Sequence, residues 1–134
     1  MASLIDIEGI GPGRLEKLQA QGLKTTDDLL DCCGSAAGRK KVEGATGISC
    51  DMLLDWVNRA DLFRVKGVGT QYSDLLEAAG VDSATELAQR RADNLLAKMA
   101  EVNAEKKLVR QLPTETQVAG WIENAKTLPK VVTH

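Results

Sequence analysis

A glycine-containing pattern occurs twice in this chain of 134 residues, and it restricts the possible folds more than any other feature. Each copy reads apolar-x-Gly-apolar-Gly, then a stretch that favours helix, then Gly-apolar. The three glycines correspond at one constant spacing, as Gly9 and Gly67, Gly11 and Gly69, and Gly22 and Gly80. The sequence therefore predicts one structural unit that is repeated.

The similarity between the two copies extends beyond the glycines. Thr25–Leu29 corresponds to Ser83–Leu87, and each segment begins with a hydroxyl residue that can cap a helix, three positions before a carboxylate. Further along, Ser49–Ala60 corresponds to Thr114–Ala125, and by that point the second copy has gained seven residues. The stretch that contains the additional residues is predicted to form two helices, roughly over residues 94–102 and 104–111.

Two glycines directly before a helix are typical of a helix-hairpin-helix motif. We call the first turn hairpin one (Ile7–Gly11) and the second hairpin two (Val65–Gly69). Apolar residues recur at helical spacing, and no alternating strand-like run of any length appears. The sequence predicts an all-α fold in which two helix-hairpin-helix repeats, residues 7–62 and 65–128, pack with pseudo-twofold symmetry. They are expected to form one compact domain, residues 1–134, of about eight short helices.

A helix is expected beside each hairpin. Hairpin two follows the predicted helix Cys50–Ala60, whereas the chain before hairpin one is too short for an equivalent helix. The C-terminal helix Glu115–Ala125 resembles Cys50–Ala60 in sequence, and we expect it to fold back beside hairpin one. Trp56 and Trp121 would then occupy equivalent positions at the two helix-hairpin junctions.

The start of a helix after such a turn can bind an anion. Its first backbone N–H groups have no acceptor within the helix, and the helix dipole adds partial positive charge. Hairpin two has Lys66 where hairpin one has Glu8, so hairpin two is the better phosphate site. Candidate DNA-binding residues are Arg64, Lys66, Gly67, Gly69, Thr70 and Gln71 at hairpin two, and Gly9, Gly11, Gly13, Arg14 and Lys17 at hairpin one.

The charge of the chain limits how strongly it can bind a nucleic acid. The formal net charge is −2. Residues 1–62 contain seven Lys/Arg and ten Asp/Glu, a balance of −3, and residues 63–134 contain ten and nine, a balance of +1. Because neutralised phosphates supply most non-specific affinity for DNA, any such affinity is expected to be modest and strongly dependent on salt.

Other clusters of charge are expected to be solvated helix surfaces. The densest basic run is Gly38–Lys41, and similar pairs occur at Arg90–Arg91 and Lys106–Lys107. A second phosphate contact at Gly38–Lys41, or a partner surface near the later pairs, is the functional alternative. Asp27, Asp28 and Asp31 are expected to favour the start of their helix through its dipole.

The side chains that catalysis and metal binding need are missing from the pattern. The only histidine is His134, which excludes a Ser-His-Asp triad inside the chain. Three cysteines, Cys32, Cys33 and Cys50, lack the spacing of a zinc site and are expected to be buried or half-buried free thiols. We therefore expect a protein that is not an enzyme and has no cofactor and no bound metal.

The tandem hairpins, Gly22–Leu30 and Trp56–Leu62 together resemble a bacterial family of tandem helix-hairpin-helix proteins, a domain of unknown function. The segments from Lys66 to Val81 and from Leu128 to Thr133 are similar to the same family. The resemblance implies an all-helical fold. The wider superfamily implies sequence-independent binding of duplex DNA through the hairpin amides.

Two functions follow from these observations. The first is weak, non-specific binding of double-stranded DNA by the hairpin amides, and the alternative is a protein-interaction or scaffold module, with a protein partner or a second copy of the chain. No signal peptide, membrane span or lipidation motif is found, so a cytoplasmic protein without membrane contact is expected.

Overall fold

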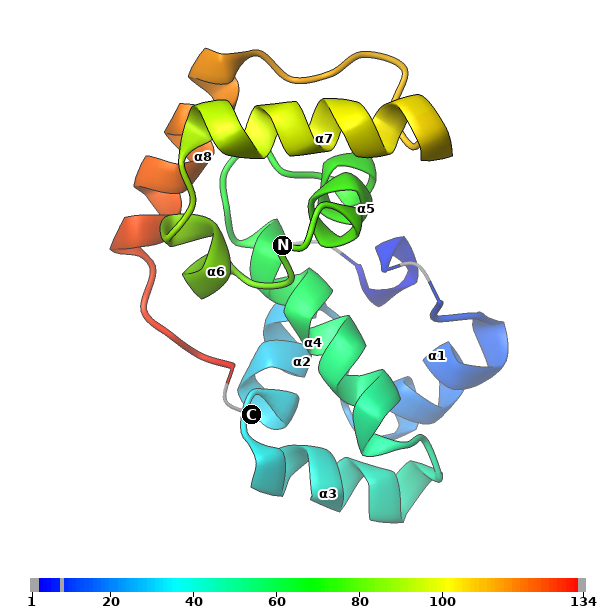
Figure 1. Cartoon of the computed structure of the whole chain (residues 1–134). Coiled ribbons are helices and arrows are strands. Elements are labelled where there is room, and N and C mark those ends of the chain that lie inside the picture. The colour runs from blue at the N-terminus through cyan, green and yellow to red at the C-terminus, as the bar shows by residue number, and fades with distance from the viewer. Residues whose placement is uncertain (1–2, 8, 133–134) are drawn as a thin grey trace. The chain divides into compact units, whose positions relative to one another are not determined.

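The regular structure of the chain is helical throughout the described residues. The computed structural model describes residues 3–7 and 9–132, with Ile5 as backbone only (Figure 1). In chain order its elements are η1 (Leu4–Asp6), α1 (Pro12–Ala20), α2 (Thr26–Cys33), α3 (Ala36–Thr46), α4 (Cys50–Phe63), α5 (Thr70–Ala78), α6 (Ala84–Ala88), α7 (Ala92–Lys106) and α8 (Glu115–Thr127). Eight α-helices within the described residues confirm the predicted all-α fold. None of these helices combines the length and the apolar character that crossing a membrane requires.

The helices divide into two compact units. Unit one comprises residues 1–61 together with 130–134, and unit two comprises residues 62–129. Unit one contains η1, α1, α2, α3 and most of α4, and unit two contains α5, α6, α7 and α8. The division between residues 61 and 62 lies one residue before the end of the first predicted repeat. The expected twofold packing of the repeats into a single domain stays a prediction.

Local signals determine where several helices begin. The Thr25 hydroxyl accepts a hydrogen bond from the Asp28 amide at 3.2 Å, and the Asp28 carboxylate accepts one from the Thr25 amide at 3.1 Å. Thr114 and Gln117 make the same reciprocal pair at the start of α8. Ser83 caps α6 by accepting from the Glu86 amide. The caps predicted at Thr25 and Ser83 are confirmed, and each satisfies an amide that the helix leaves free.

Each unit buries its own set of aliphatic residues together with one tryptophan. In unit two, Trp121 belongs to one buried cluster with apolar side chains of α5, α6, α7 and α8, and Tyr72 lies beside it with ring centroids 5.1 Å apart and ring planes tilted by 53°. The helix α8 packs against α6 and α7, and α5 packs against α7 (Figure 1). In unit one the buried apolar residues include Leu4, Ile7, Ile10, Leu18, Leu23, Leu29, Leu30, Val42, Leu53, Trp56, Val57 and Val132.

The position predicted for the C-terminal helix is wrong. Helix α8 lies against hairpin two, because a Cβ built on Gly67 would be only 3.0 Å from the indole nitrogen of Trp121. Hairpin one instead meets α4, where a Cβ on Gly9 would be 3.2 Å from the indole nitrogen of Trp56. Each hairpin therefore packs against the last long helix of its own repeat. Only the residues after α8 return to unit one, where Val131 contacts Gly34.

The additional residues of the second repeat form one helix and an extended loop, not the two predicted helices. Helix α7 continues past Val102 because nothing in that stretch interrupts it, and it ends at Lys107, which has a left-handed backbone (φ 52°). The side chain of Asn103 then holds the loop by accepting from the Val109 amide at 3.0 Å and donating to the Val109 carbonyl at 3.1 Å.

Two side-chain groups of unit one have a structural role. Arg39, expected on a solvated surface, is buried and donates hydrogen bonds to the carbonyls of Cys33 and Gly34, both at 3.0 Å. The thiols are free as predicted, with Cys33 buried and Cys32 and Cys50 half-buried. Burial raises the pKa of the Cys33 thiol to about 12. Burial, reinforced by Glu43, also raises the pKa of Cys50.

The contact between Gly67 and Trp121 generates a prediction about stability. Replacing Gly67 by alanine places a Cβ on a residue with φ +92° and within 3.0 Å of the indole. We expect Gly67→Ala to lower the free energy of unfolding by about 1–3 kcal/mol. Gly120→Ala is the matched control in α8, where a Cβ meets no atom within 4 Å, and it should raise stability by up to about 1 kcal/mol. Urea unfolding measures both changes, and shifts of the same sign would contradict the prediction.

The Asp28 cap generates a prediction about pH. Hydrogen bonds from the Lys24 and Thr25 amides hold the pKa of Asp28 below its usual value of 3.8. A depressed folded pKa stabilises the fold above the unfolded pKa, and this contribution is lost as the pH falls through the folded value. Asp28→Asn should therefore lower the Tm at pH 7, and the difference from the wild type should shrink towards zero below pH 3.8. Asp27→Asn, on the exposed side of the same helical turn, should show a smaller difference at pH 7.

Candidate nucleic-acid interface

Hairpin two is a tight turn whose apolar residues point inward. The amide of Val65 donates a hydrogen bond to the Leu62 carbonyl, and the amide of Val68 donates one to the Val65 carbonyl, each at 3.1 Å. Val65 and Val68 are buried, whereas Lys66, Gly67 and Gly69 are exposed. The left-handed backbone of Gly67 turns the chain between them. As a result the exposed edge of the turn leads directly into the first residues of α5.

The start of α5 has backbone donors without partners in the helix. Gly69 is the N-cap and provides no side chain, and the first bond of the helix runs from the Ser73 amide to the Gly69 carbonyl at 2.9 Å. The amides of Thr70, Gln71 and Tyr72 therefore have no acceptor within the helix. Thr70 and Gln71 are exposed, so their side chains can supply further donors beside those amides.

The cations predicted at hairpin two have different roles in the structure. Lys66 is exposed. Arg64 is half-buried and donates to the carbonyl of Pro129 at 3.0 Å, so it holds the chain after α8 against the beginning of hairpin two. Lys66 is therefore the cation of this turn with its side chain in solvent, and Arg64 is committed in part to the fold.

Asn124 is a residue of this site that the sequence did not predict. Its Oδ1 atom accepts a hydrogen bond from the amide of Lys66 at 2.9 Å, which fixes the turn to α8. The corresponding position of the first repeat is Arg59, so the repeat pattern gave no signal for it. The bond also removes the Lys66 amide from the set that could bind an anion.

Hairpin one has a similar backbone but a different start of helix. Gly9 is exposed with φ +96°, and the amide of Ile10 donates to the Ile7 carbonyl at 3.3 Å. Gly11 is the N-cap of α1 and Pro12 the first residue of that helix, which removes one amide from its first turn. The other candidate residues, Gly13, Arg14 and Lys17, are exposed, and Glu8 lies outside the described residues.

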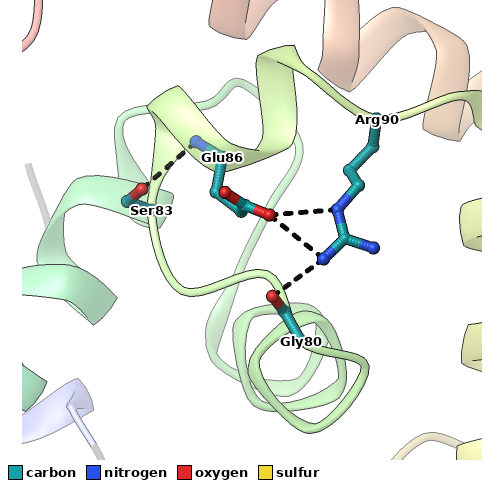
Figure 2. Close-up of polar contacts among 4 residues, drawn as sticks. All are labelled: Gly80, Ser83, Glu86 and Arg90. Atoms are coloured by element: carbon teal, nitrogen blue, oxygen red, sulfur yellow. Dashed lines mark hydrogen bonds and ion pairs between the residues drawn. The ribbon is translucent and has the colours of Figure 1, made fainter.

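Among the remaining charged clusters, the Arg90–Arg91 pair is neutralised within unit two. Figure 2 shows Arg90 held by the Glu86 carboxylate, at 3.1–3.2 Å, and by the Gly80 carbonyl at 3.0 Å. Arg91 pairs with Asp93 at 3.2 Å. Among the described residues no group of three or more acidic, histidine or cysteine side chains could hold a metal ion. Lys106 and Lys107 differ from this arginine pair, because they are exposed and form no ion pair with a described residue, and the same holds for Lys40 and Lys41 on α3.

Comparison with known proteins places the chain in a family. No curated protein and no solved structure matches the chain. A family model described as a domain of unknown function, DUF4332, matches residues 8–128, from hairpin one to the end of α8. Both hairpins and all eight α-helices fall within or overlap that match. The chain therefore belongs to the DUF4332 family.

Proposed function

We propose that the two repeats are helix-hairpin-helix units and that the protein binds the backbone of duplex DNA without sequence preference and without catalysis. In this proposal hairpin two makes the principal contact. Its backbone amides at the start of α5 bind a phosphate, and Lys66, Thr70 and Gln71 surround it.

The observation that carries the proposal is the chemistry of the exposed edge of hairpin two. From Arg64 to Gln71 the chain contains two cations and no carboxylate. The apolar residues of the turn are buried, so the surface that remains consists of glycine backbone, amides, a hydroxyl, a carboxamide and the Lys66 ammonium. Such a surface can donate hydrogen bonds to a phosphate from several directions at once.

Hairpin one has a secondary role in this proposal. Arg14 and Lys17 are exposed on α1 and can interact with a phosphate, but Pro12 supplies no amide. The sequence also places the acidic Glu8 in this turn. A carboxylate beside the turn would repel a phosphate, so hairpin one contributes less affinity than hairpin two.

A protein-interaction module, with a protein partner or a second copy of the chain, is the alternative. It is favoured by a cleft of about 520 Å³ in unit one between α3 and α4, whose lining includes Ala36, Ala37 and Leu54. The net charge of −2 also suits such a role. The DNA proposal ranks first because hairpin two has unpaired donors and no neighbouring carboxylate in its own segment.

Fluorescence anisotropy of a labelled duplex across a salt series tests the DNA proposal. We expect micromolar binding at low salt that weakens steeply as salt rises. Lys66→Glu removes one phosphate contact and adds repulsion, so it should weaken binding by about 10–100-fold. The negative slope of log K against log salt should become shallower by about 1.

The control is Lys41→Glu, an exposed cation on α3 that makes the same change in net charge. It should weaken binding far less than Lys66→Glu. Flat anisotropy of the wild type at low salt would eliminate DNA and leave the protein-interaction module. Equal losses in the two variants would show that net charge, not hairpin two, determines binding.

A further inference from the structure

We propose that the cleft at the α7–α8 loop, lined by Lys107 and Arg110, binds backbone phosphates of the same DNA duplex that hairpin two contacts. This inference rests on the proposed function and extends it by a second phosphate-binding surface. It assigns a role to the residues that the second repeat has in addition to the first.

The cleft lies entirely within unit two and has a volume of about 560 Å³. Gln71 from the first turn of α5 lines one side, and Asn103, Lys107 and Arg110 are among the lining residues from the end of α7 and the loop after it. The helices α5 and α7 pack together, and the loop (orange in Figure 1) leads from α7 to α8. Because Gln71 belongs to both surfaces, the cleft continues the proposed phosphate site of hairpin two.

The charged side chains that line the cleft are all positive. They are Lys107 and Arg110, and no carboxylate is among the lining residues. Both cations are exposed, and neither forms an ion pair with a described residue. A concave surface with unpaired cations attracts anions more strongly than the same charges spread over a convex surface.

The other cations of unit two differ in this respect. Arg90, Arg91, Lys98 and Lys126 each pair with a carboxylate on or near their own helix. The cations that form no ion pair with a described residue are Lys66 at hairpin two and Lys106, Lys107 and Arg110 at the end of α7 and in the loop. The uncompensated positive charge of unit two is therefore found at hairpin two and around the cleft.

Stabilisation of helix α7 accounts for only part of this arrangement. A cation in the last turn, such as Lys106, interacts favourably with the helix dipole. Lys107, however, has a left-handed backbone at φ 52°, a position that glycine occupies at lower cost. Arg110 lies beyond the helix, where the dipole gives no reason for a cation. Binding of phosphates explains both residues.

The loop is held in a way that presents these cations. Asn103 forms two hydrogen bonds with the backbone of Val109, and the Val109 side chain is buried. The residues on either side of Val109 are thereby fixed to the end of α7. The backbone that carries Arg110 is therefore positioned before any ligand binds, which lowers the entropic cost of binding.

Lys107→Gly and Arg110→Gln test the inference in the same salt series on the full chain. Each should make the negative slope of log K against log salt shallower by about 1 and weaken duplex binding several-fold. Lys107→Gly should at the same time raise the urea midpoint, because glycine suits the left-handed backbone. Lower affinity in a more stable variant cannot be attributed to a damaged fold.

Lys41→Gln on α3 is the matched control, because it removes one exposed cation from unit one, and its slope should equal that of the wild type. Unchanged slopes in both cleft variants, with weak binding by Lys66→Glu, would overturn the proposed phosphate binding by the cleft and leave that by hairpin two supported. Shallower slopes in the cleft variants, with normal binding by Lys66→Glu, would support phosphate binding by the cleft and overturn that by hairpin two. A wild type that does not bind duplex DNA would overturn both proposals.

Discussion

The rest of each unit depends on the close approach of a left-handed glycine to a tryptophan indole. At Gly67 and Gly9 a Cβ would meet the indole nitrogens of Trp121 and Trp56 at 3.0 and 3.2 Å, so a larger residue would require the indole or the turn to shift by a few tenths of an ångström. In both cases the tryptophan comes from a long helix late in the same repeat. The contact therefore joins the beginning of a repeat to its end.

This closure determines what hairpin two offers to a ligand. Its two valines turn into the core that Trp121 organises, and the Lys66 amide is occupied by Asn124. The donors that remain are those at the start of α5, next to the exposed side chains of Thr70 and Gln71. These contacts hold the turn in place, so an anion would meet donors that are already positioned, which favours binding.

The conformations of individual turns and helix caps could be predicted from the sequence. Which helix packs against which hairpin could not. The positive φ of Gly67 and the cap at Thr25 follow from residue types and from bonds within a few positions. The pairing of α8 with hairpin two depends on Trp121, and the same sequence pattern fits either hairpin. At the candidate site, the exposed Lys66 was predictable, but the bond of Arg64 to a carbonyl at the other end of the unit was not.

Net charge is a poor guide to what this surface can bind, because a phosphate responds to charges within about 10 Å at ordinary salt. The chain carries −2 overall, which argues against a strong DNA binder. In unit two, however, ion pairs such as Arg91–Asp93 and Lys126–Glu123 cancel locally and contribute little attraction or repulsion. The cations without such partners lie at hairpin two and at the end of α7 and its loop. The proposed binding of a phosphate backbone over a small area is therefore compatible with a nearly neutral protein, and the affinity that the proposal predicts falls steeply as salt screens those few charges.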